Sequence, residues 1–471
     1  MKKEKNRFNT QIDVAEKMPQ FQSPSGKLKR ELTLLSATAI VVGNMIGSGI
    51  FAAPQGLAAS STPLWTMLAW VITGIGSLLI ALSFANLGTK YPESGGPVVY
   101  TQKAFGDATA FMVSFTFLIG LMIGNAAIIT TLVRYLSEVF PIFGSSFPAF
   151  FVESAMLWGF TLINIRGVKG AGLVSQYALG IKIFALGLFI VIGIVGFDMA
   201  NLFTVSEQVI ETTGGSGFIN TLPIAIGITL WSFIGIESAA MAGGEVVNPD
   251  KNIRKSTIYG TLLTILIYMI ISFLAMGAMN QSDLSSQTAP LAEILNRITG
   301  TSFGGKFFAM CIVLGGIGSG SGWILTTGRA GYSMAKDGFF PKKFASVNEK
   351  TGTPIFALVT ASIITNLFFL FSFIGLKQAF DYLIALASLT MMPAYIFSCF
   401  AEIKLLKMEE ELTFWIFIKK SILPLLASVY VLYVIYAIGA EYALFTFILM
   451  LAGIPIYIFT NKKQSGGIVG N

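Results

Sequence analysis

Glycine and polar residues interrupt the first long apolar segment of the chain, and their backbone groups could bind a solute. Residues 43–51 read GNMIGSGIF. Glycine is a poor helix former, so a helix is expected to break here. A break at bilayer depth leaves N–H and C=O groups unpaired, which is tolerated only where they line a cavity or meet a ligand. The sequence therefore predicts a solute site near the middle of a membrane.

A second interruption lies near the start of the second half of the chain. Residues 230–239 read LWSFIGIESA, and residues 243–249 read GGEVVNP. Paired interrupted helices at matching positions in two halves are typical of inverted-repeat transporters. An alternative is that small residues only let helices pack closely. That alternative accounts for Gly43, Gly47 and Gly49, but not for the ionisable Glu237 beside the second break.

The two breaks offer complementary chemistry. A half-helix that begins after Gly47, Ser48 and Gly49 presents free N–H groups and a positive dipole end, which suit a carboxylate. A half-helix that ends near Ile234 leaves free carbonyl groups, which suit an ammonium group. Together the two breaks predict a receptor for the backbone of an α-amino acid.

Two ionisable residues fall inside apolar segments, where charge is expensive and usually functional. Glu237 could balance ligand charge, handle a proton or stabilise a gate; alternatively it is a neutral carboxyl bonded to the first-span backbone. Lys182 lies about 15 Å into its span at about 1.5 Å per residue. That depth is near the middle of a hydrocarbon core about 30 Å thick. We favour Lys182 as a cation that takes the place of a bound sodium ion; a proton carrier and a packing residue are the alternatives.

Three further residues are candidates for contact with a substrate side chain. Trp231 and Trp323 lie away from the predicted span ends, and small residues precede Trp323, so its ring could stack on a cationic group. Membrane anchoring is the alternative for any single tryptophan. Asn125 is a polar residue in the middle of a span, and could bond a substrate or a neighbouring helix.

The composition identifies a helical membrane protein. The 471 residues are 54% hydrophobic and 12% charged, whereas soluble domains carry about 25% charged residues. The chain contains no histidine, which removes histidine-based metal sites, proton relays and catalytic triads. Cys311 and Cys399 fall in predicted spans, and we interpret both as packing residues. We expect no metal and no cofactor.

Hydropathy predicts about twelve spans. They begin near Leu32, Leu64, Ala108, Ala149, Gly172, Phe218, Ser256, Phe303, Ile355, Phe380, Ser421 and Tyr442. Most of the 31 Lys and Arg residues lie in the N-terminal tail and in alternate loops, which places both termini in the cytoplasm. The net charge of +7 is therefore explained by topology and does not indicate nucleic-acid binding.

The expected organisation is an all-α polytopic protein with a 5+5 inverted-repeat core whose first and sixth helices are broken. The expected divisions are a basic tail (1–30), a first repeat (31–200), a second repeat (201–408), two further helices (409–462) and a C-terminal tail (463–471). Partners are the lipid bilayer and a small amino acid or amine.

The motifs at the two breaks resemble those of a known group of transporters. Residues 43–51 resemble the first-helix motif of the amino acid–polyamine–organocation superfamily. Residues 231–239 resemble the sixth-helix motif of its basic amino acid/polyamine antiporter family. The resemblance covers nearly the whole chain and implies a LeuT-like fold of twelve helices, ten of them in the core.

The resemblance also implies roles for individual residues. The substrate carboxylate would meet the Ser48 and Gly49 amides, and its α-amine the Met45 and Ile234 carbonyls. Trp231 would cap the site, Trp323 would stack on the substrate side chain, and Gly120 and Asn125 would contact its distal end. Asn44 and Gly47 complete the substrate-binding candidates, while Glu237 and Lys182 are the gating and coupling candidates.

This chain departs from the arginine–agmatine exchangers of that family at three positions. Phe117 stands where they have a tyrosine, and Ala394, rather than Tyr395, aligns with their tenth-helix tyrosine. Those exchangers lack a counterpart of Lys182, which resembles a lysine of arginine–ornithine-type and proton-coupled members.

The expected function is sodium-independent exchange of a cationic amino acid (arginine, ornithine or lysine) for a related amino acid or amine. The alternative is a proton-coupled amino acid permease of neutral or broad specificity. A channel would need a continuous polar lining, and the sequence offers no paired carboxylates or activated nucleophile for an enzyme. We expect a bacterial inner membrane, and the family resemblance allows a homodimer.

Overall fold

The computed structural model describes residue 30 and residues 32–93, 95–166, 168–373, 379–408 and 412–465. Most of the predicted N-terminal tail and the last residues of the C-terminal tail lie outside the described residues. Nearly all of the described chain is helical, with one isolated β-bridge between Leu32 and Val246. The all-α prediction is confirmed.

Ten of the described segments are long and apolar enough to cross a membrane, by length and composition. Two shorter apolar helices, Phe218–Trp231 and Ile355–Leu370, coincide with two further predicted spans. The protein is therefore a polytopic membrane protein, and the total of twelve spans stays a prediction.

The first half of the chain forms one broken helix and a series of long helices. They are α2 (Leu34–Met45), α3 (Gly49–Ser60), α4 (Pro63–Lys90), α5 (Pro97–Phe105), α6 (Asp107–Val139), α7 (Ser146–Ile165) and α8 (Val168–Val195). Side-chain caps fix two of the starts: Thr33 accepts from the Ser36 amide, and Thr62 accepts from the Trp65 amide.

The second half contains another interrupted helix, formed by α10 and α11. Its helices are α9 (Glu207–Thr213), α10 (Phe218–Trp231), α11 (Ser238–Met241), α12 (Pro249–Ala278), α13 (Gln281–Ser286), α14 (Pro290–Thr299), α15 (Ser302–Lys336), α16 (Ile355–Phe373), α17 (Ala379–Met408), α18 (Phe414–Ile438) and α19 (Ala440–Ser465). Helices α5, α9, α13 and α14 lie between the predicted spans. Each is too short to register as a span, although α14 buries Leu291, Ile294 and Leu295 on one face.

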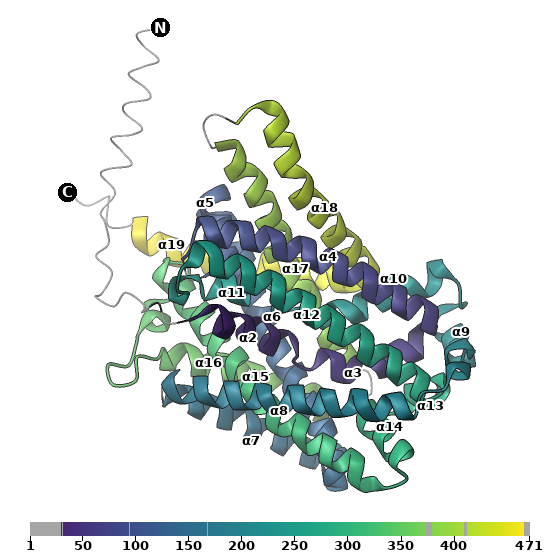
Figure 1. Cartoon of the computed structure of the whole chain (residues 1–471). Coiled ribbons are helices and arrows are strands. Elements are labelled where there is room, and N and C mark those ends of the chain that lie inside the picture. The colour runs from purple at the N-terminus through teal and green to yellow at the C-terminus, as the bar shows by residue number, and fades with distance from the viewer. Residues whose placement is uncertain are drawn as a thin grey trace, which may run out of the picture.

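The broken helix lies in the middle of the bundle. In Figure 1, α2 and α3 run between α12 on one side and α8 and α15 on the other. In α6, 89% of the most apolar 18-residue stretch is buried inside the protein, whereas in α19 the buried share of the corresponding stretch is 11%. Helix α6 is therefore a core element and α19 a peripheral one, as a helix that faces lipid would be.

The long helices alternate in direction, which defines two ends of the bundle. Helix α2 begins at one end, and the segments after α4, α11 and α15 return to it (Figure 1). We call this end the N-terminal face and the other end the opposite face. Each interrupted helix changes path partway between the two faces, at residues 46–48 and 232–237.

Candidate functional site

The two predicted breaks are in direct contact, and glycine makes this contact sterically allowed. A Cβ at Gly49 would lie 2.5 Å from Ser232 Cα. Gly235 has φ +115°, a conformation that favours glycine, and a Cβ there would lie 3.1 Å from the Asn44 carbonyl carbon. The Asn44 Nδ2 group donates to Ser238 Oγ at 2.8 Å. The sequence therefore uses glycine both to interrupt each helix and to bring the interruptions together.

The first break leaves amide groups that can bind an anion. Helix α3 begins at Gly49, so its first N–H groups have no acceptor within the helix. Ser48 precedes the helix and makes no side-chain cap bond. Its Oγ instead accepts a 2.9 Å hydrogen bond from Trp231 Nε1. The N-terminus of α3 is thus a suitable place for a carboxylate.

The carbonyl groups at the breaks differ in availability. Among the described residues, the structure records no hydrogen bond to the Ile234 carbonyl. The Met45 carbonyl accepts from the Gly47 amide at 2.7 Å and from the Tyr268 hydroxyl at 2.6 Å. A carbonyl oxygen has two lone pairs, so both of those at Met45 are already used. Ile234 therefore offers the freer acceptor for an ammonium group.

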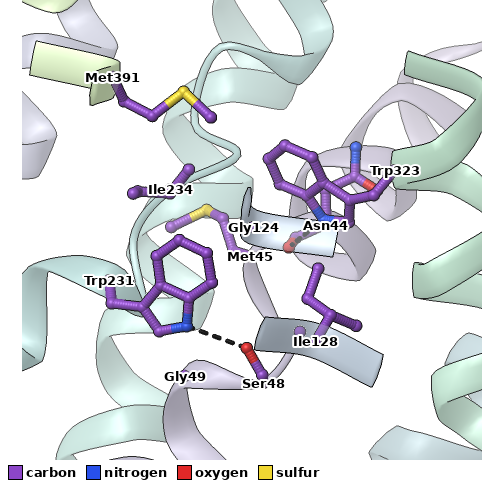
Figure 2. A pocket seen from close by; sticks show the side chains of 11 residues that line it. Asn44, Met45, Ser48, Gly49, Gly124, Ile128, Trp231, Ile234, Trp323 and Met391 are labelled. Carbon is purple, nitrogen blue, oxygen red and sulfur yellow. Dashed lines mark hydrogen bonds between the residues drawn. The ribbon is translucent and has the colours of Figure 1, made fainter. Parts of the chain in front are cut away.

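A cavity opens where these groups meet. Its empty volume is about 310 Å³, counted to include openings toward solvent. Figure 2 shows the Trp231 and Trp323 rings on two sides of this space, with Met391 at another edge. The lining residues are Asn44, Met45, Gly47, Ser48, Gly49, Gly124, Ile128, Trp231, Ile234, Trp323 and Met391. They come from both breaks and from α6, α15 and α17.

Lys182 ties the first break to two neighbouring helices. Its side chain is 2% exposed. The Nζ atom donates to the Gly43 carbonyl at 3.0 Å, to the Ile46 carbonyl at 2.6 Å and to the Ser319 hydroxyl. The ammonium group of α8 is thereby coordinated by oxygen atoms from α2, from the break itself and from α15. A bound cation would be held by the same kind of ligands.

Glu237 makes a corresponding link at the second break. It is 2% exposed, and its Oε2 accepts from the Tyr395 hydroxyl at 2.8 Å and from the Gly235 amide at 3.2 Å. The recorded partners of this carboxylate therefore lie on α17 and in its own segment, and not on the first-span backbone. Tyr395 of α17 is therefore a direct partner of Glu237.

Comparisons with known proteins bear on the family. A sequence profile described as "Amino acid permease" matches residues 32–467. The chain belongs to the amino acid permease family. This permease is 31% identical over 459 residues to a "Putative arginine/ornithine antiporter" of Bacillus subtilis, covering 90% of this chain and 96% of the relative.

Two other relatives have similar identity and coverage. An "Arginine/ornithine antiporter" of Latilactobacillus sakei is 30% identical over 455 residues, which cover 94% of this chain and 92% of the relative. An "Arginine/agmatine antiporter" of Chlamydia trachomatis is 30% identical over 456 residues, which cover 92% of each chain. These relatives identify the permease as a transporter of the amino acid–polyamine–organocation superfamily, not an enzyme.

Most of the predicted substrate-binding residues lie on the cavity wall, but two do not. Gly120 packs against α17, where a Cβ would lie 2.5 Å from Thr390 Oγ1. Asn125 is 2% exposed, and its Nδ2 donates to Thr327 Oγ1 at 2.9 Å. Its Oδ1 is buried and has no recorded hydrogen-bond partner among the described residues. Asn125 follows Gly124, which lines the cavity, so it lies just behind the wall.

Three lining residues were missed in the sequence analysis: Gly124, Ile128 and Met391. Gly124 and Ile128 are four residues apart on α6 and so share a helix face. Gly120, which the sequence analysis did single out, lies four residues before Gly124, so the four-residue spacing could have indicated this face of α6. Met391 offered no such signal, because it is one of many apolar residues in the middle of α17.

Proposed function

We propose that this permease is a sodium-independent antiporter that exchanges a cationic amino acid, arginine, ornithine or lysine, for a related amino acid or amine. The names of the three relatives support the substrate class and the exchange. The Lys182 contacts support sodium independence, because its ammonium group uses the Gly43 and Ile46 carbonyls that a sodium ion would need. This arrangement is the observation that carries the proposal.

In this proposal the substrate backbone bridges the two breaks. Its carboxylate accepts hydrogen bonds from the Ser48 and Gly49 amides, and its α-amine donates to the Ile234 carbonyl. The Met45 carbonyl would join only if Tyr268 or Gly47 released it. Gly47 and Asn44 shape the first break around the bound backbone.

The side chain of the substrate is held without a carboxylate, since none of the lining residues is acidic. The Trp323 ring stacks on the cationic group, an interaction worth about 0.5–2 kcal/mol depending on its desolvation. The Asn125 Oδ1, which is buried behind the cavity wall without a recorded partner among the described residues, supplies an acceptor at the distal end when the wall opens toward it, beside Gly120. Nitrogen donors of a guanidinium or ammonium group match that acceptor.

Transport follows alternating access between the two faces. Trp231 caps the site from the opposite face through its bond to Ser48. Glu237 and Tyr395 hold the second break in position and act as a gating and coupling pair. The repeats at 31–200 and 201–408 move relative to each other in a bacterial inner membrane. Both termini lie on its cytoplasmic side, and the family resemblance allows a homodimer.

The test is uptake of radiolabelled arginine into sodium-free proteoliposomes. Vesicles are loaded with arginine, ornithine, lysine, agmatine or a neutral amino acid, or are left empty. We expect rapid uptake only into vesicles that contain a cationic partner. Uptake into empty vesicles that rises with an imposed proton gradient would contradict the antiporter proposal and favour a proton-coupled permease.

A further inference from the structure

An ion pair at the N-terminal face connects α15, which lines the site, with the segment that follows the second break. Arg329 Nη1 of α15 lies 3.1 Å from Glu245 Oε1, and the side chains are 39% and 21% exposed. Glu245 ends the 3₁₀ helix η3 (Gly243–Glu245), which follows α11 and the second break. Arg329 lies on the same helix as Trp323, nearer to the N-terminal face. The pair therefore bridges α15 and the chain that continues from Ile234.

Other segments close around this pair. The Leu32 amide donates to the Glu245 carbonyl, and the Val247 amide donates to the Leu32 carbonyl, each at 2.9 Å. The Gly95 amide donates to the Met241 carbonyl at 3.3 Å. A Cβ at Gly243 would lie 3.1 Å from the Glu93 carbonyl oxygen. The residues before α2, the loop between α4 and α5, and the segment from α11 to Val247 thus pack against one another at the N-terminal face.

We propose that the Arg329–Glu245 ion pair is a gate that holds the route from the site to the N-terminal face closed and opens in each transport cycle. The proposal rests on the alternating access described above. A substrate can leave toward this face only if α15 and the segment after the second break separate, and that separation breaks the pair. Arg329 and Glu245 are thus positioning residues that act on the equilibrium between closed and open states.

The exposure of the pair suits this role. A partly exposed ion pair contributes little free energy, because water and salt screen it. It can therefore bias the closed state and still break in each cycle. By contrast, the Lys182 contacts are almost fully buried and would be costly to break.

The experiment measures how fast a thiol behind the gate reacts. Thr326 is half-buried on α15, three residues after Trp323 and three before Arg329, so Thr326→Cys places a thiol between the cavity and the ion pair along this helix. Cys311 and Cys399, both buried, are replaced by alanine in the background. A membrane-impermeant maleimide is applied from the side of the N-terminal face, without substrate. We expect Arg329→Gln and Glu245→Gln each to speed labelling about three- to fivefold, as loss of a weak ion pair would.

Two further variants separate a gate from a general loosening of the structure. The double reversal Arg329→Glu with Glu245→Arg should restore slow labelling. Glu293→Gln should leave the rate unchanged, because Glu293 pairs with Arg297 within α14 at 3.4 Å and bridges no gate.

The proposal is overturned if both single variants label at the parental rate, or if the double reversal labels as fast as they do. Because labelling needs no substrate, a permease that fails to exchange arginine could still pass this test. Failure of the gate and failure of the proposed function are therefore distinguishable.

Discussion

Replacing Lys182 by methionine tests whether its ammonium group does the work of a bound cation. Methionine keeps an unbranched, apolar stem of similar length but removes all three hydrogen bonds of the Nζ atom. The Gly43 carbonyl retains the Ser319 hydroxyl, which donates to it at 3.2 Å. The Ile46 carbonyl loses its recorded partner. The damage is therefore concentrated at the first break.

The expected size of the effect follows from these contacts. A hydrogen bond to a charged group contributes about 1.5–3 kcal/mol. Losing the hydrogen bond to Ile46, and part of the free energy of the other two bonds, should destabilise the conformation that binds substrate by about 3 kcal/mol. At about 1.4 kcal/mol per tenfold change in rate, exchange should fall about a hundredfold. Ser319→Ala, which removes one hydroxyl that accepts from the charged Nζ atom, should cost about 1.5 kcal/mol, or about tenfold.

The assay is arginine exchange in proteoliposomes at several pH values, with the amount of folded protein measured by size-exclusion chromatography. We expect Lys182→Met to lose exchange across the whole pH range. Exchange at the parental rate would refute the cation role. Exchange that persists but no longer responds to a proton gradient would instead identify Lys182 as a proton carrier.

Other contacts of the site give smaller predicted effects. Trp323→Ala should weaken arginine binding about three- to thirtyfold. Trp323→Phe should weaken it much less, because a ring remains to stack on the cation. If Trp323→Ala bound arginine with the parental affinity in a radioligand assay, the stacking role would be excluded. Glu237→Gln should lower turnover about fivefold by weakening the bond from Tyr395, and turnover equal to the parent at every pH tested would make Glu237 structural only. Gly124→Ala should raise the apparent KM for exchange, since its Cβ would lie 3.1 Å from the Trp231 ring; a KM equal to that of the parent would show that the ring can move aside.

The breaks could be predicted from the sequence because their composition conflicts with their surroundings. Glycine destabilises a helix, and polar residues destabilise an apolar span, by more free energy than packing alone returns. The same reasoning identified Lys182 and Glu237. In each case the cost was visible in the sequence, and the structure shows the contacts that offset it.

The partners of those residues could not be predicted in the same way. Tyr268 and Tyr395 reach the breaks from α12 and α17. A stripe of buried residues at helical spacing, Thr257, Thr261, Thr264 and Ser272, marks the inward face of α12, but no pattern in the sequence shows which group each tyrosine hydroxyl meets. Asn125 was expected at the cavity, yet it donates to Thr327, a residue 202 positions away in sequence. Pairings of this kind depend on how the helices are rotated against one another, which the hydrophobic pattern of a membrane span does not specify.

The most direct test of the central claim is a structure of the permease with arginine bound. The claim is that the two breaks hold the backbone of the substrate. We predict a carboxylate within hydrogen-bond distance of the Ser48 and Gly49 amides, an α-amine at the Ile234 carbonyl and a guanidinium group over the Trp323 ring. Arginine bound elsewhere, or bound with its carboxylate away from the start of α3, would contradict the account.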